Sequence, residues 1–191
     1  MEGAMAVVAT PATTVDEDLV ALADGMAAAA ARFVQLAETV AAGIGEDQAI
    51  SLLLLEVSDM LAMGARLGAI ADVVPEGRYE PDAGAEPDVD RLRAALAERL
   101  APIDAYVEVF DPYARPELVP SRLSDDLCVI VTDLLHGLAH HAAGRNLEAL
   151  WWWQTTYLSS WGDAGACVLR ALRSLVSHVR SGAPLEVDEA D

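Results

Sequence analysis

The chain has 191 residues, with 31 acidic and 12 basic side chains and a formal charge of −19. This length suits a single domain that buries a core without disulfides. Such acidity repels nucleic acid and anionic membrane surfaces, so we expect no direct nucleic-acid binding. All the basic residues are Arg. The absence of Lys excludes lysine Schiff-base chemistry and a phosphate-binding loop ending in GK[ST].

The cellular compartment is predicted from the absence of a recognisable signal sequence, of a long apolar run and of paired cysteine motifs. The longest uninterrupted apolar run is too short to span a bilayer, and the N-terminus carries Glu2 with no positive region. Cys128 and Cys167 lie in helical patterns without CxxC spacing, which is typical of reduced core residues. We therefore expect a cytoplasmic protein without a membrane segment.

The first half of the chain predicts two long helices. Residues 1–13 read as a flexible N-terminal arm, and residues 14–181 as a single helical domain. Apolar residues at helical spacing predict a helix from Thr14 or Asp16 to Gly43. A second helix is expected over about 46–71, followed by a surface loop over 72–88 that is rich in Pro, Gly and acids.

The second half predicts shorter helices. One starts at Asp88 or Asp90 and ends at Leu100, and another is expected over 103–110, where Asp111-Pro112 stops it. Residues 113–120 read as a loop.

The stretch 121–161 holds all four Trp and reads as two helices. Ser124 is the expected N-cap of the first, which closes at Gly144. Asn146 begins the second, which Gly162 is expected to end; a last helix follows from Asp163. Residues 182–191 read as an acidic disordered tail. The fold class is therefore all-α, a bundle of about six to seven helices.

Two groups of polar residues are candidates for a divalent metal site or acid–base chemistry. Glu56 and Asp59 share a flank of the second helix, and Asp126, Asp133, His136 and His140 recur three, four and seven apart, which stacks them on one helix face. The alternative is a solvated polar face, since Asp near a helix N-terminus and His near its C-terminus suit the helix dipole. The pattern lacks HExxH, and no cofactor is expected beyond this metal.

The tryptophans and nearby residues are candidates for a binding surface. Trp151, Trp152 and Trp153 spread around the helix, so either two helices flank them or one is exposed. Exposed Trp marks partner surfaces, which makes Trp152 and Trp153 candidates, although core positions are the alternative. Gln154 is the expected buried polar residue. The remaining candidates are Arg170 and Arg173, on the outer side of the last helix.

Several motifs in order resemble one bacterial family. They are SLLLLE at 51–56, VFDPY at 109–113, SDDL at 124–127, WWWQ at 151–154 and WG at 161–162. The chain resembles the family catalogued as domain of unknown function 5063 over most of residues 48–180. That family has no established activity, so the resemblance implies no catalytic residue.

Three functions remain open. The leading hypothesis is a non-catalytic interaction or adaptor protein that binds a protein partner or forms a homo-oligomer, because catalytic motifs are missing and Trp residues are crowded. An alternative is a metal-dependent hydrolase of nucleotides or phosphoesters, since helical bundles can gather acids around metals. A second alternative is an acidic DNA mimic acting on a recombination or repair protein.

Overall fold

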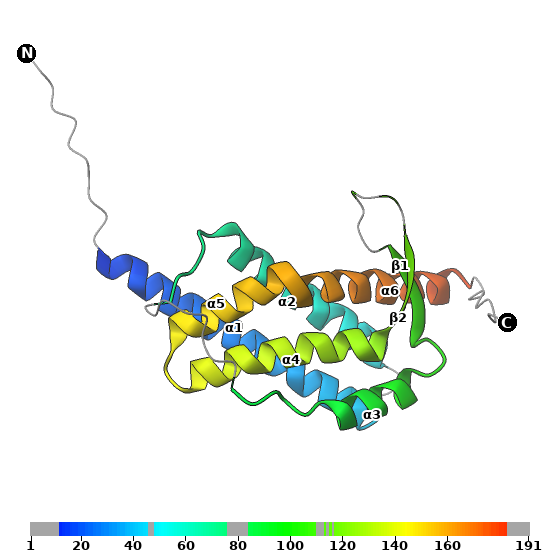
Figure 1. Ribbon diagram of the computed structural model, residues 1–191. Helices are drawn as coiled ribbons and strands as arrows, with labels where there is room; N and C mark the ends of the chain where they lie inside the picture. The colour runs from blue at the N-terminus through cyan, green and yellow to red at the C-terminus, as the bar shows by residue number, and fades with distance from the viewer. Residues whose placement is uncertain are drawn as a thin grey trace, which may run out of the picture.

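The computed structural model describes residues 12–45, 48–75, 84–109, 113, 115 and 117–182. Its long helices lie side by side, with a two-stranded hairpin at one end of the bundle (Figure 1). The helices are α1 (Ala12–Ala41), α2 (Ala49–Ala69), α3 (Asp90–Leu100), α4 (Leu123–Ala142), α5 (Asn146–Thr156) and α6 (Gly162–Ser181). Most of the predicted arm and tail, and residues 76–83 of the loop, lie outside the described residues.

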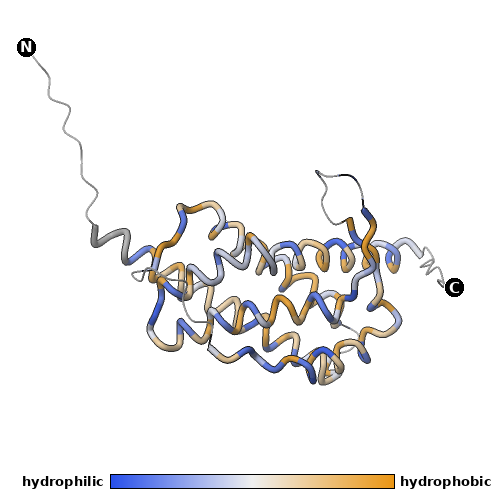
Figure 2. Tube along the Cα trace, in the orientation of Figure 1, coloured by the Kyte–Doolittle hydropathy of each residue, from blue (hydrophilic) through white to orange (hydrophobic). Residues whose placement is uncertain are grey.

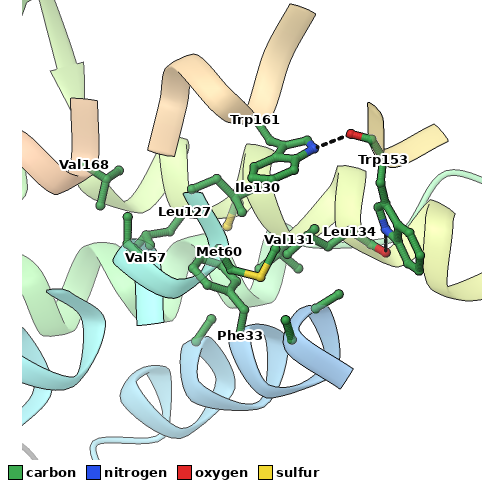
Figure 3. Packing of buried hydrophobic residues seen from close by; sticks show 14 of the residues in the cluster. Phe33, Val57, Met60, Leu127, Ile130, Val131, Leu134, Trp153, Trp161 and Val168 are labelled. Carbon is green, nitrogen blue, oxygen red and sulfur yellow. Dashed lines mark hydrogen bonds between the residues drawn. The ribbon is translucent and has the colours of Figure 1, made fainter. Parts of the chain in front are cut away.

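The helix α4 lies at the centre of the bundle and contacts α1, α3, α5 and α6. Apolar residues run along its middle and along the helices beside it (Figure 2). Leu127, Val131 and Leu134 are buried there, packed near Phe33 of α1 and Met60 of α2 (Figure 3). Burial of such side chains contributes about 1.5–3 kcal/mol each, so α4 organises the core.

Trp153 and Trp161 close the top of this core. The Trp153 indole N–H donates to the backbone oxygen of Leu134, and the Trp161 indole N–H donates to the backbone oxygen of Trp153, each at 3.2 Å (Figure 3). The Trp153 ring lies directly on Gly137, where any Cβ would overlap the indole. A glycine is therefore required for α5 to approach α4 this closely.

The expected break at Gly162 is wrong. A π-helical turn, η2 (Tyr157–Trp161), joins α5 to α6, so the chain runs through Gly162 as helix. A Cβ on Gly162 would overlap the backbone oxygen of Tyr157 and meet its ring at 2.8 Å. The glycine thus allows the wider turn to pack, and it does not mark a helix end.

The expected helix over 103–110 is also wrong. Residues Ala105–Val109 form strand β1, which pairs antiparallel with β2 (Leu118–Arg122) in a two-stranded sheet. Alternation in the segment AYVEV, with β-branched and aromatic residues, is a strand signal that outweighs helical spacing over so short a stretch. The inward side of the hairpin packs toward α4 through Tyr106, whose hydroxyl donates to Asp126.

Ser124 does not cap α4 with its own side chain. The carboxylate of Asp104, just before β1, accepts hydrogen bonds from the Ser124 backbone N–H at 2.8 Å and from its hydroxyl at 3.0 Å. This buried carboxylate takes up free N–H groups of the first turn. The cap comes from 20 residues upstream, so local sequence gives no sign of it.

Candidate functional site

The acidic residues of the predicted metal site are separated by their partners. Glu56 forms an ion pair with Arg32 of α1 at 3.4 Å, and Asp59 is exposed on α2. Asp126 accepts hydrogen bonds from the Tyr106 hydroxyl at 2.6 Å and the Ser121 hydroxyl at 3.1 Å. Burial raises the pKa of Asp126.

The remaining three candidates form a buried row on α4. His136 and His140 are buried and Asp133 is half-buried, so the alternative of a solvated polar face is wrong for this row. The reason is that helices surround α4 on several sides. Trp152 of α5 packs over both imidazoles, with ring centroids 4.9 Å from His136 and 6.2 Å from His140.

This row does not converge on a metal. Within the described residues, no group of three or more His, Cys, Asp or Glu side chains is arranged to hold an ion. His140 Nδ1 lies 3.0 Å from Glu148 Oε2, and its Nε2 is buried without a hydrogen-bond partner in the part of the chain that the structure describes. The structure therefore does not bring together in one group the six predicted metal ligands, Glu56, Asp59, Asp126, Asp133, His136 and His140.

Asp133 lies beside the π-helical turn, and its Oδ2 atom is buried without a hydrogen-bond partner among the described residues. The nearby Ser160 hydroxyl, His136 and the Trp161 backbone N–H each act to lower its pKa. Burial has the larger effect, and the pKa of Asp133 is raised.

Gln154 fastens the segment after α2 to α5. Its side-chain oxygen accepts a hydrogen bond from the Val73 backbone N–H at 2.8 Å. Its amide nitrogen donates to the backbone oxygens of Leu67 at 2.8 Å and Ala71 at 3.4 Å. Leu67 lies in the last turn of α2, whose carbonyls lack helical partners. The buried Gln154 thus both caps α2 and positions the extended segment 71–75.

Two open grooves, each of about 530 Å³, share this extended segment. One lies toward α5, the other toward α1 and the start of α5. The first is lined by Asp72, Val73, Val74, Pro75, Trp151, Gln154, Thr155, Leu158 and Ser159. The second is lined by Asp18, Leu19, Leu22, Ile70, Ala71, Asp72, Val73, Val74 and Leu147. Most of these residues are apolar.

The exposed side chains at the grooves are large and hydrophobic. Val74 is 75% exposed and Leu158 is 67% exposed, while Trp151 is half-buried beside them. The ionisable residues that line the grooves are both acids, Asp18 and Asp72. We call the two grooves and the Val74 side chain between them the Val74 surface.

The other surface candidates fare differently. Trp153 is fully buried, which corrects its assignment as a surface candidate, because α4 covers it through Gly137. Trp152 is half-buried against the imidazole row, and its indole N–H has no partner among the described residues. Arg170 and Arg173 are exposed on α6 and form no ion pair with a described residue. Trp151 lies beside the Val74 surface. It is not among the surface candidates predicted from the sequence, because helical spacing places it on the same face as core residues.

The sequence also gave no indication of a polar cluster behind the hairpin. Tyr106 lies between Asp126 and Glu108. Burial raises the pKa of its hydroxyl most, and the negative charges of these two carboxylates raise it further. Burial, together with Glu108, raises the pKa of Cys167 to about 12. The protonated Tyr106 hydroxyl donates a hydrogen bond to Asp126, so this cluster secures the hairpin to α4.

One stretch, Glu17–Ala41 within α1, is long and apolar enough to cross a membrane by length and composition. Polar residues interrupt this stretch, so it contains no long uninterrupted apolar run. Met26, Phe33 and Val40 of this helix are buried in the core of the bundle, and a core helix passes the same test.

Comparison with known proteins identifies a sequence family and a similar solved structure. A sequence model of the family described as Domain of unknown function (DUF5063) matches residues 17–178. The crystal structure of protein BF1032 from Bacteroides fragilis is similar, with a TM-score of 0.64 and 19% identity. That likeness covers 78% of this chain and 89% of that chain, and at this identity it shows the fold alone. None of the curated proteins matches.

Proposed function

Because the chain belongs to this family of unknown function, DUF5063, from which no activity carries over, we propose a function from its surface: a non-catalytic protein-interaction module. Its Val74 surface binds a short apolar segment of a partner protein that carries basic residues at its flanks. The observation behind the proposal is the pair of apolar grooves that share Val74, whose ionisable lining residues are acidic.

Hydrophobic exposure supports binding at this place. Isolated exposed apolar residues are ordinary, whereas adjacent ones next to a groove are typical of interaction sites. Val74 and Leu158 are both more than half exposed and line the same groove as Trp151. Tryptophan is among the residues that supply most of the binding energy in protein interfaces when a partner covers them, and burial of Val74 and Leu158 adds apolar area around it.

Electrostatics favours a basic partner. The chain carries a formal charge of −19, and Asp18 and Asp72 lie in the grooves. Complementary charge raises the association rate and suppresses wrong partners, and its effect falls as salt increases. An apolar segment with Arg or Lys at its ends therefore suits the site better than an acidic one.

The position of the surface is fixed in advance of binding. Gln154 holds the extended segment by bonds to Val73, Leu67 and Ala71. Preorganisation lowers the conformational cost of association. The grooves thus combine apolar contact area with a backbone that needs little ordering.

The test is selection of random peptides on the full chain, followed by titration of the selected peptides against two matched variants. L158S removes an exposed leucine from the groove, and L55S removes one that is 64% exposed elsewhere, on α2. Selected peptides are expected to combine apolar residues with basic flanks and to bind L55S normally. Acidic selected peptides, or equal binding by L158S and L55S, would contradict the proposal.

A further inference from the structure

The two strands of the hairpin have unequal outer edges. The Leu123 backbone N–H donates to the Asp104 oxygen at 2.9 Å, which makes Asp104 and Leu123 a hydrogen-bonded pair at the base of the ladder. Bonded and non-bonded pairs alternate in antiparallel sheets. The backbone N–H and C=O groups of Ala105, Val107 and Val109 therefore point away from β2, toward the outer edge of β1.

The outer edge of β2 is protected. Pro120 pairs with Val107 at a non-bonded position, so its missing N–H falls on the outer side of β2. Proline at such a position blocks the addition of another strand. No ladder bond within the hairpin is lost, which explains why a proline is tolerated there.

The outer edge of β1 has no such protection. Ala105, Val107 and Val109 form no backbone hydrogen bond with any other element among the residues that the structure describes. The strand contains neither Pro nor Lys, the residues that commonly guard edges. A two-stranded hairpin is marginal by itself and is stabilised by further strands or by packing.

The outward face of the hairpin is apolar. Side chains alternate along each strand, with Tyr106 and Glu108 directed inward and Val107 directed outward. Val107 is 56% exposed, and Leu118, which pairs with Val109, is 71% exposed. An added strand would thus gain hydrogen bonds from the edge and apolar contacts from this face.

The strand is complementary to itself. Antiparallel pairing of two copies about a two-fold axis at Val107 places Val107 opposite Val107 and Ala105 opposite Val109 of the second copy. Each of these pairs exchanges two backbone hydrogen bonds. On the inward face Tyr106 lies opposite Glu108 of the second copy, so no acid meets an acid across the axis. An axis at Glu108 is excluded, because its backbone groups bond to β2 and like charges would face each other.

We propose that a second copy of this chain pairs with the outer edge of β1, which gives a continuous four-stranded antiparallel sheet and a two-fold symmetric dimer. Two-fold pairing of identical surfaces is the commonest form of homo-oligomer. The interface is separate from the Val74 surface and does not depend on it. Because each copy carries −19, the dimer tightens as salt screens the repulsion, opposite to the salt response of a basic peptide.

Sedimentation of the full chain over a concentration series, at low and high salt, tests the proposal with two proline variants. V107P removes an outward N–H from the β1 edge, and L118P removes one from the β2 edge. Neither loses a bond within the hairpin. We expect wild type and L118P to dimerise and V107P to remain monomeric while still binding selected peptides. A wild type that stays monomeric, or a V107P that dimerises as well as L118P, would overturn the proposal.

Cysteine cross-linking keeps the test independent of how V107P folds. In the dimer, the Cα atoms at position 107 are about 5.5 Å apart, within disulfide range. Those at position 118 lie three strand spacings apart across the sheet and four residues apart along it, which is roughly 20 Å. Under mild oxidation V107C should form a covalent dimer at least tenfold faster than L118C. Equal rates for the two variants would overturn the proposed register.

Discussion

Replacement of Gln154 by leucine tests the fastening of the Val74 surface. In Q154L the Val73 N–H and the Leu67 oxygen lose partners 2.8 Å away, and the Ala71 oxygen loses a weaker one at 3.4 Å. A buried polar group left without a partner costs about 1–3 kcal/mol. The gain from an apolar side chain offsets part of this, so we expect Q154L to lose about 2–4 kcal/mol of unfolding free energy.

Urea denaturation followed by circular dichroism measures that loss, and hydrogen exchange at Val73 reports the segment itself. Exchange of the Val73 amide should accelerate more than exchange in α4 because the segment opens locally. The matched control is Q35L on the exposed side of α1, which should change stability by about 0.5 kcal/mol or less. Equal stability of Q154L and Q35L would refute the role assigned to Gln154.

Three further predictions concern packing, pH and salt. G137A should destabilise by about 1–2 kcal/mol in thermal or urea unfolding, because its Cβ overlaps an indole. G25A on α1, whose Cβ would meet only the Met63 side chain at an ordinary 3.7 Å, should stabilise by up to about 1 kcal/mol. Burial raises the pKa of Asp133, so the folded state holds its proton to higher pH than the unfolded state does. Wild-type stability should therefore fall as pH rises from about 4 through the folded-state pKa, and D133N should fall less; equal slopes would contradict this. D72N should weaken binding of selected peptides several-fold and reduce its salt dependence, whereas D59N, on the exposed side of α2, should change neither.

The sequence predicted the helices well because their apolar periodicity is long. Regular spacing over α1, α2 and α4 gave these helices to within a few residues, and the buried Gln154 was expected from its place among apolar neighbours. The chain is mostly helical, with the family resemblance confirmed by the match over residues 17–178.

The errors arise where distant contacts override local pattern. Gly162 resembles a helix stop, but its missing Cβ makes room for Tyr157 in the π-helical turn. His136 and His140 resemble a solvated face, but Trp152 covers them. The cap on Ser124 comes from Asp104, far along the chain. Such pairings depend on tertiary packing, which a helical wheel does not contain.

The Val74 surface was the hardest feature to predict. Its groove needs Val74 from an irregular segment, Leu158 from the π-helical turn and Leu22 from α1. Their common position follows from the bonds of Gln154 and from the packing of α5 against α2. Among the consecutive tryptophans, the one beside the grooves is Trp151, whereas the sequence favours Trp152 and Trp153 as surface candidates.

The most direct measurement is the dissociation constant of a selected peptide for L158S and L55S, determined side by side by fluorescence anisotropy. If the buried leucine contributes about 1.5–3 kcal/mol to binding, its loss raises the dissociation constant roughly ten- to hundredfold. We expect a loss in that range for L158S and less than a twofold change for L55S. Equal dissociation constants for the two variants would contradict binding at the Val74 surface.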